Sequence, residues 1–341
     1  MRAVGCRRSL PIDAPEALVD VELPDPVATG RDLLVEVRAV SVNPVDTKVR
    51  RRAGPDELGG VKVLGYDAAG VVRATGPEAT LFRPGDEVFY AGSIARQGTN
   101  AELHLVDERI VGPKPRSLDF AQAAALPLTS ITAWEMLFDR LDVRRPVPGA
   151  ANAILIIGGA GGVGSIAIQL ARRLTGLTGL AVVATASRPE TRAWVEELGA
   201  HHAVDHRGDL AAQVRDLGLG APAFVFSTTN TGDHLEAIVE LIAPQGRLGL
   251  IDDPAALDAL PLKRKSLSLH WELMFTRPLF GTADMEAQHE LLAEVSRLVD
   301  EGTLRTTLAK TMGPIRAENL KRAHALIESG RSRGKVVLAG F

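Results

Sequence analysis

Residues 154–164 read Ile-Leu-Ile-Ile-Gly-Gly-Ala-Gly-Gly-Val-Gly. Four apolar residues followed by glycines predict a buried strand that turns tightly into the next element. Gly159, Gly161 and Gly164 satisfy the pattern G-x-G-x-x-G, which is typical of dinucleotide binding when a strand precedes it and a helix follows it. The alternative is a tight strand-to-helix turn that binds nothing.

The residues after this turn have the period of an amphipathic helix. Apolar side chains recur at i, i+3, i+4, i+7, i+8 and i+11, namely Val163, Ile166, Ala167, Leu170, Ala171 and Leu174. The first turn of such a helix offers unpaired N–H groups and a partial positive charge, which suit a pyrophosphate. We therefore expect cofactor contacts from Gly159, Gly161, Gly162, Val163 and Gly164.

The end of the second expected strand, residues 180–185, indicates which dinucleotide binds. An acidic residue about 20 positions beyond the glycine motif would bind the ribose 2′-hydroxyl of NADH. This chain has Ser187 and Arg188 there instead, with Arg192 one helical turn later. Hydroxyl and guanidinium groups bind phosphate well, so we predict NADPH rather than NADH. The alternative is that both arginines are solvated surface charges.

The composition is that of a globular protein large enough for two domains, with 341 residues, 45% hydrophobic and 24% charged, and a net charge of −3. No clustered basic face is evident, so nucleic-acid binding is not expected, and the run Arg50-Arg51-Arg52 is interpreted as a solvated loop. Cys6 is the only cysteine, which excludes an intrachain disulfide and fits a cytoplasmic location. We find neither a signal-peptide core nor an apolar stretch long enough to span a bilayer, so no membrane association is expected.

The expected secondary structure changes along the chain. The first 125 residues or so are β-rich, with expected strands at Asp32–Val40, Ala68–Ala74, Glu87–Tyr90 and Ala101–Leu105. From Ile154 onward, short apolar strands alternate with helices, which predicts an α/β fold with a doubly wound parallel sheet. Residues 284–301 and 317–328 have helix patterns, and a last apolar strand spans Gly334–Leu338. We expect the β-rich domain to contain residues 1–125 and 276–341, and the nucleotide-binding domain residues 126–275.

Several blocks, in a matching order over nearly the whole chain, resemble the zinc-independent branch of the medium-chain dehydrogenase/reductase superfamily. This is the group around NADPH:quinone oxidoreductases and enone reductases. Besides the glycine run, the blocks are residues 42–48, 64–72, 84–88, 124–128, 132–135 and 334–338. The resemblance implies a Rossmann-type domain plus a GroES-like catalytic domain. Residues 269–277 resemble a subfamily often labelled zinc-binding alcohol dehydrogenase.

The residues conflict with that zinc label. Zinc-dependent relatives have a cysteine ligand where this chain has Asn43, and a His-Glu pair where it has Tyr66-Asp67. A four-cysteine structural lobe would follow Tyr90, and no cysteine lies there. Asparagine and tyrosine are poor zinc ligands beside thiolate and imidazole. We therefore predict neither a structural nor a catalytic zinc ion.

Without a Lewis acid, we expect the hydride acceptor to be a quinone or an α,β-unsaturated carbonyl compound. Tyr66 is the first candidate to donate a hydrogen bond to the developing oxyanion, and the alternative is a packed tyrosine with a structural hydrogen bond. Asn43 either orients the substrate or caps the backbone before Pro44. We expect Asp46 to form a polar pair with Lys48, which either lines the site or lies at the protein surface.

The resemblance also implies roles for residues away from the glycine run. Thr132 is expected near the nicotinamide carboxamide or ribose, the alternative being a helix-start hydroxyl. Lys335 is expected near the cofactor, the alternative being a surface lysine on the last strand. In the segment His270-Trp271-Glu272 we favour a core tryptophan flanked by polar neighbours over a substrate pocket.

The favoured function is an NADPH-dependent, zinc-free oxidoreductase that reduces a quinone or an enone, both small molecules. One alternative is a reductase or dehydrogenase of simple aldehydes or alcohols. Another is a non-catalytic NADPH-binding sensor, which an intact glycine run would permit. Relatives often dimerise edge to edge, and Ser266–Leu269 is the candidate edge strand of a homodimer.

Overall fold

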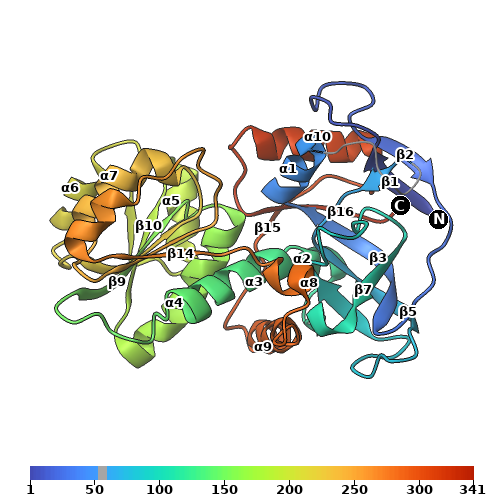
Figure 1. Ribbon diagram of the computed structural model, residues 1–341, viewed down its shortest axis with the longest axis horizontal. Helices are drawn as coiled ribbons and strands as arrows, with labels where there is room; N and C mark the ends of the chain where they lie inside the picture. The colour runs from blue at the N-terminus through green and yellow to red at the C-terminus, as the bar shows by residue number, and fades with distance from the viewer. Residues whose placement is uncertain (53–59) are drawn as a thin grey trace. The chain divides into compact units, whose positions relative to one another are not determined.

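The computed structural model describes residues 1–52 and 60–341. The chain divides into two compact units, drawn in Figure 1. Unit 1 contains Met1–Ile131 and Phe275–Phe341, and unit 2 contains Thr132–Met274. No helix in the described residues is long and apolar enough to cross a bilayer.

Unit 2 is built on a parallel sheet, which in the described residues has six strands in the order β11-β10-β9-β12-β13-β14. This is the order 3-2-1-4-5-6 of a dinucleotide-binding fold. Its strands are β9 (Ala151–Ile157), β10 (Ala181–Thr185), β11 (His202–Val204), β12 (Pro222–Ser227), β13 (Arg247–Leu250) and β14 (Ser268–Trp271). The connecting helices are α4 (Gly162–Thr178), α5 (Pro189–Glu197), α6 (Leu210–Asp216) and α7 (Thr231–Leu241). The predicted doubly wound parallel sheet is confirmed.

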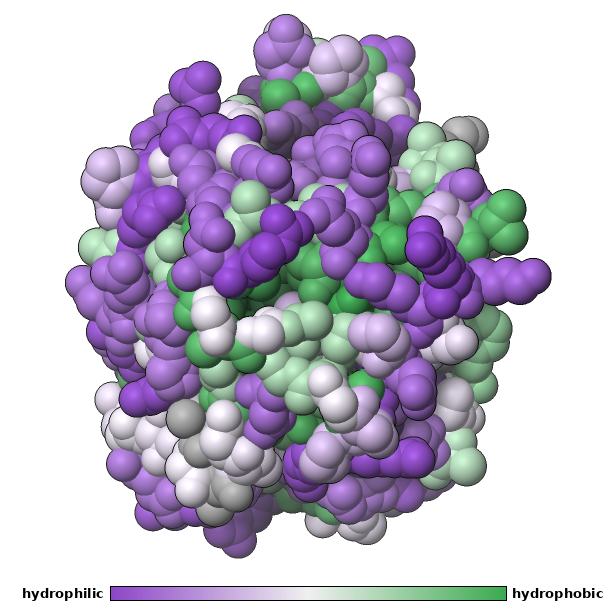
Figure 2. All heavy atoms as spheres, turned by 90° about the vertical axis from the view of Figure 1, so that its left-hand side faces the viewer, coloured by the Kyte–Doolittle hydropathy of each residue, from purple (hydrophilic) through white to green (hydrophobic). Residues whose placement is uncertain are grey.

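The apolar run that opens the glycine motif forms the centre of this sheet. Ala153–Ile157 of β9 are all buried, because β10 and β12 pair with β9 on either side and helices cover both faces. Figure 2 shows a face of unit 2 on which hydrophilic side chains surround a hollowed apolar area. The nucleotide motif therefore follows a strand in the interior of the sheet whose last five residues are buried.

The edge strand β14 begins later than predicted, because the residues before it form a short 3-10 helix at Leu260–Lys265. Trp271 at its end is 50% exposed, so the prediction of a core tryptophan is wrong. Alternation along a strand places successive side chains on opposite faces. The next side chain, Glu272, is buried and its Oε2 accepts a hydrogen bond of 2.8 Å from Arg140 Nε.

Unit 1 contains two sheets in the described residues. A seven-stranded sheet has the order β15-β16-β3-β5-β6-β8, with β7 paired to β3, and a three-stranded sheet has the order β2-β1-β4. The strands are β1 (Arg2–Cys6), β2 (Val19–Glu22), β3 (Asp32–Val42), β4 (Lys62–Val63), β5 (Ala68–Thr75), β6 (Glu87–Tyr90), β7 (Leu103–Asp107), β8 (Val111–Pro113), β15 (Leu308–Thr311) and β16 (Lys335–Ala339). Because β16 pairs with β3, the larger sheet joins segments from both ends of the chain.

The helices of unit 1 connect and flank these strands. They are α1 (Pro44–Arg52), α2 (Phe120–Ala124), α8 (Thr276–Phe280), α9 (Ala287–Asp300) and α10 (Ala317–Glu328), and α3 (Pro127–Trp134) begins in this unit. The sequence patterns had indicated α9 and α10 but not α1. Its start follows from Asn43 before Pro44, since proline suits the first helical position.

The prediction of a solvated loop at Arg50–Arg52 is wrong. All three arginines lie in α1, and the Arg50 side chain is 1% exposed. Its Nη2 forms an ion pair with Glu328 of α10, and its Nη1 donates to the carbonyl of Leu10. A single buried arginine can therefore join two helices from distant parts of the chain, which no local charge pattern indicates.

Beside this pair, His324 of α10 is completely buried, and neither ring nitrogen has a hydrogen-bond partner among the described residues. Burial, and next the charge of Arg50, lower the pKa of His324 to about 3. An unfolded histidine binds its proton near pH 6.5, so the unfolded state gains a proton as the pH falls below that value while the folded state does not. The contribution of His324 to the free energy of unfolding is therefore fully present above pH 6.5 and is lost as the pH falls towards 3.

We expect the free energy of urea unfolding to fall between pH 6 and pH 4, with His324 contributing about 1.4 kcal/mol per pH unit. The variant His324→Leu should have a slope smaller by that amount. Identical slopes for the two proteins over this range would contradict the assignment.

Candidate active site

The glycine run lies between β9 and α4, and its glycines serve different purposes. A Cβ atom on Gly159 would lie 2.8 Å from Ala184 Cβ, and one on Gly164 would lie 2.7 Å from Gly159 Cα, so both glycines permit close packing of the turn. A Cβ on Gly161 would meet only the carbonyl oxygen of Gly158, at 3.3 Å. Open space at Gly161, beside the first N–H groups of α4, fits the pyrophosphate of a dinucleotide.

The end of β10 bears the residues predicted to select the dinucleotide. Arg188 is partly exposed and its Nε pairs with Glu190 Oε1 at 3.1 Å. Arg192 Nη1 donates to the carbonyl oxygen of Ala203 at 3.2 Å, so this guanidinium is partly used to join α5 to β11. Both arginines therefore make contacts within unit 2.

A third arginine, which sequence reasoning missed, reaches the same place. Arg207 Nη2 donates to the carbonyl oxygen of Ser187 at 2.7 Å and pairs with Asp205 Oδ2 at 2.7 Å. The hydrogen bonds from Arg207 lower the pKa of Asp205 to about 2. Arg207 follows β11, and the carboxyl ends of neighbouring parallel strands meet at one edge. Its position three residues after a predicted strand was the available signal.

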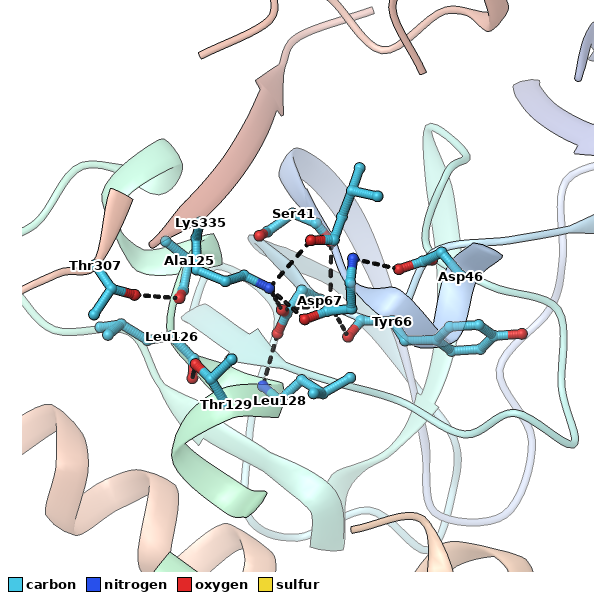
Figure 3. Close-up of polar contacts among 12 residues, drawn as sticks. Ser41, Asp46, Tyr66, Asp67, Ala125, Leu126, Leu128, Thr129, Thr307 and Lys335 are labelled. Atoms are coloured by element: carbon cyan, nitrogen blue, oxygen red, sulfur yellow. Dashed lines mark hydrogen bonds and ion pairs between the residues drawn. The ribbon is translucent and has the colours of Figure 1, made fainter. Parts of the chain in front are cut away.

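Unit 1 holds a buried polar cluster around Lys335, shown in Figure 3. Lys335 Nζ lies 2.8 Å from Asp67 Oδ2 and 3.4 Å from the carbonyl oxygen of Val42, and it also donates to Asn43 Oδ1. The side chains of Lys335 and Asp67 are 3% and 0% exposed. The alternative that Lys335 is a surface lysine is therefore wrong.

Asn43 and Asp67 are held in one orientation by further hydrogen bonds. Asn43 Nδ2 donates to Asp67 Oδ2 at 2.8 Å and to the carbonyl oxygen of Tyr66 at 3.3 Å. The other oxygen of Asp67 accepts from the backbone N–H of Leu128 at 2.7 Å, which satisfies a donor in the first turn of α3. The cluster thus joins the end of β3, the start of β5, α3 and β16.

Asp46 contacts the same cluster through the backbone. Its Oδ2 accepts from the N–H of Asn43 at 2.7 Å, which caps the start of α1. Its Oδ1 is buried and has no hydrogen-bond partner among the described residues. Burial raises the pKa of Asp46 to about 7, although the hydrogen bond from Asn43 and the charge of Lys335 act against it.

Tyr66 points its ring away from Lys335 (Figure 3) and packs edge to face on Phe275, with ring centroids 5.5 Å apart. Its hydroxyl is buried and has no hydrogen-bond partner among the described residues. Burial, and next the charge of Asp46, raise the pKa of Tyr66 above its ordinary value, so the phenol is neutral. In contrast, the hydroxyl of Tyr90 lies 3.2 Å from His104 Nδ1. Buried hydroxyl groups without a hydrogen-bond partner are rare in folded proteins.

The predicted site residues therefore fall into two groups. Asn43, Asp46, Tyr66 and Lys335 lie together in unit 1. In unit 2, the glycine run follows β9, Ser187 and Arg188 follow β10, Arg192 lies on α5, and Thr132 is buried on α3.

Two family models match the chain. Residues 29–116 match the alcohol dehydrogenase GroES-like domain, and residues 198–338 match zinc-binding dehydrogenase. A zinc-type alcohol dehydrogenase-like protein of Staphylococcus aureus is 39% identical, with 99% of each chain covered. The chain belongs to the medium-chain dehydrogenase/reductase superfamily. It is an oxidoreductase of the branch that resembles zinc-binding alcohol dehydrogenases, and the predicted Rossmann-type and GroES-like architecture is confirmed.

Solved structures agree with this membership. A putative zinc-dependent alcohol dehydrogenase from Rhizobium etli is 66% identical with a TM-score of 0.97, covering 100% of this chain and 98% of that one. A mycobacterial protein solved in complex with NADPH is 25% identical with a TM-score of 0.81, covering 99% of this chain and 100% of that one.

The names of several relatives mention zinc, but the side chains at the ligand positions fit that ion poorly. The oxygen atoms of Asn43 and Asp67 already accept from an ammonium group, and the phenol of Tyr66 points elsewhere. Residues 1–52 and 60–341 contain no group of three or more His, Cys, Asp or Glu side chains placed to hold a metal ion. Neither amide nor phenol competes with thiolate and imidazole for zinc.

Proposed function

We propose that this oxidoreductase uses NADPH, works without zinc, and reduces a quinone or an α,β-unsaturated carbonyl compound. The observation that carries the proposal is the site in unit 1. There a lysine ammonium lies on Asn43 and Asp67, and the neutral Tyr66 phenol has no hydrogen-bond partner in the part of the chain that the structure describes. An unactivated carbonyl needs strong polarisation to accept hydride, whereas a quinone or enone yields an already stabilised product.

When bound, the nicotinamide supplies a hydride, which the acceptor takes up together with a proton. In this proposal the N–H groups of Gly162, Val163 and Gly164 hold the pyrophosphate, Gly161 leaves it room, and Gly159 lets the turn pack closely against β10. Thr132 contacts the nicotinamide side of the cofactor. The similarity to a mycobacterial protein complexed with NADPH supports the choice of cofactor.

Tyr66 is the proposed donor to the substrate. A hydrogen bond from its hydroxyl to the acceptor oxygen would stabilise the negative charge that develops there. It would also satisfy a hydroxyl that has no partner within residues 1–52 and 60–341. Asn43 and Asp46 act as positioning residues, since both are buried and hydrogen-bonded to the cluster.

The proposed 2′-phosphate contacts are Ser187, Arg188 and Arg207. Losing one charge-assisted contact to a phosphate costs about 1.5–3 kcal/mol, which is roughly 10- to 150-fold in affinity. We expect Arg207→Ala and Arg188→Ala each to raise the dissociation constant for NADPH by that factor and to leave that for NADH nearly unchanged. Fluorescence titration with both nucleotides measures this.

Arg215→Ala is the matched control, because Arg215 is also an exposed arginine paired with an acid, Glu240, but on α6. It should change neither constant. A wild-type protein that binds NADH as tightly as NADPH would contradict the cofactor choice itself.

The proposal includes a homodimer and a cytoplasmic location. Strand β14 forms an edge of the sheet in unit 2, and Trp271 and Leu273 near its end are each 50% exposed. Pairing of two such edges would cover both the open backbone groups and these apolar side chains. A monomer in light scattering at micromolar concentration would count against it. The single cysteine, Cys6, fits a reducing compartment.

A further inference from the structure

We propose that the ammonium group of Lys335 takes, in this chain, the place of the metal ion of zinc-dependent relatives, and that it positions Asn43 and Asp67 for the reaction. This inference rests on the proposed zinc-free function. It assigns Lys335 a role within the protein instead of a direct contact with the cofactor.

The coordination of the ammonium group is complete. A lysine ammonium has three N–H donors, and Lys335 Nζ has three acceptors, which are the carbonyl oxygen of Val42, Asn43 Oδ1 and Asp67 Oδ2. No N–H is left over for a phosphate or ribose while these bonds persist. Asn43 and Asp67 are the residues that the resemblance aligns with a zinc ligand and with the acid of the His-Glu pair.

The positive charge of Lys335 is balanced by the negative charge of Asp67. Lys335 and Asp67 are both buried, and a buried charge is tolerated only with a partner and with its remaining hydrogen bonds satisfied. Asp67 meets this condition through Lys335, Asn43 and the N–H of Leu128. One fixed cation therefore ties together four segments of the chain, as a metal ion would.

The cation also decides how the Asn43 amide is oriented. Its oxygen must face Lys335, so its NH2 group faces Asp67 and the carbonyl oxygen of Tyr66. The hydrogen bond from Asn43 Nδ2 to the carbonyl oxygen of Tyr66 fixes the backbone at Tyr66. The phenol of Tyr66 is the proposed hydrogen-bond donor to the substrate. Removing the charge while keeping the volume would leave the amide free to turn over and the phenol less well placed.

The test compares Lys335→Met, which keeps volume without charge, with Lys335→Ala in the absence and presence of ethylammonium. Because misplacing a reacting group by about 1 Å can cost roughly 100-fold in rate, we expect both variants to lose about that factor in kcat. The dissociation constant for NADPH should stay within about threefold, because the proposal gives Lys335 no contact with the cofactor. Ethylammonium should raise both Tm and kcat of Lys335→Ala and have no effect on the wild type.

A compensated variant keeps the test decisive if Lys335→Met folds poorly. Lys335→Met with Asp67→Asn removes both charges of the buried ion pair, so its Tm should recover, but its kcat should stay low because the amide of Asn43 is no longer oriented. Full recovery of kcat in this double variant would show a purely structural ion pair and would overturn the proposal.

Lys114→Met is the matched control, because Lys114 is another buried lysine that bonds to the carbonyl groups of Pro115 and Leu118 and to Glu87. It should lower Tm without a selective loss of kcat. An NADPH dissociation constant raised tenfold or more in Lys335→Met, or no response of Lys335→Ala to ethylammonium, would overturn the proposal. Absence of wild-type turnover would refute the proposed function, while the Tm measurements would still test the role of Lys335.

Discussion

Replacing Gly164 by alanine is expected to weaken NADPH binding by roughly 5- to 150-fold. The new Cβ would lie 2.7 Å from Gly159 Cα and closer still to the carbonyl oxygen of Gly158, so the backbone of the turn must shift. Overpacking of this kind costs about 1–3 kcal/mol, which gives that range of affinity. The same shift should lower the thermal stability of the protein, because the turn joins the central strand β9 to α4. Isothermal titration with NADPH and a thermal melt measure the two effects.

Gly176→Ala provides the control in the same helix. Gly176 lies near the end of α4, and a Cβ there would meet nothing within 4 Å. Alanine is the better helix former by roughly 1 kcal/mol, so this variant should be slightly more stable and bind NADPH normally. Equal NADPH affinities for Gly164→Ala and the wild type would mean that the turn does not hold the cofactor.

Tyr66→Phe is expected to lower kcat by roughly 100- to 1000-fold, as the loss of one oxyanion donor does in other enzymes. The protein should become more stable rather than less, because the hydroxyl is buried without a partner among the described residues. Leaving a buried polar group unsatisfied costs about 1–3 kcal/mol, which the phenylalanine avoids. Activity that falls while Tm rises is therefore the signature of a group that serves the substrate and not the fold.

Tyr90→Phe is the control, because Tyr90 is the only other tyrosine of the chain. It is expected to lower stability and to leave kcat unchanged. Its hydroxyl bonds to Nδ1 of His104, whose Nε2 faces the carbonyl oxygen of Gln97. Removing the hydroxyl leaves Nδ1 unpaired, so stability should fall and kcat should hold. A Tyr66→Phe variant with wild-type kcat would remove Tyr66 from the mechanism.

Unit 2 could be predicted well because its signals are local. Apolar runs placed β10 within one residue of its observed bounds, and they placed β9 and α4 within a few residues. The glycine motif depends on backbone clearance inside a single strand-turn-helix unit, so consecutive residues are enough to predict it. A parallel sheet follows from strands that alternate with helices.

What sequence reasoning missed depends on contacts between distant segments. Arg207 meets Ser187 only because β11 pairs with β10, and Arg50 is buried only because α10 brings Glu328 to it. The same holds for the partner of Lys335. The resemblance placed Lys335 near the cofactor, but its ion pair is with Asp67, which lies 268 residues away in the chain. Trp271 misled the prediction because a large apolar side chain on an edge strand can face outward.

The central claim, hydride transfer from NADPH without zinc, is tested most directly by a panel of acceptors in the presence of a chelator. The panel contains a benzoquinone, a naphthoquinone, an aliphatic enone and a simple aldehyde, and NADPH oxidation is followed for each. The account predicts turnover of a quinone or the enone, unaffected by the chelator, and none of the aldehyde. Turnover of the aldehyde alone, activity lost on chelation, or tight NADPH binding without any turnover would contradict it.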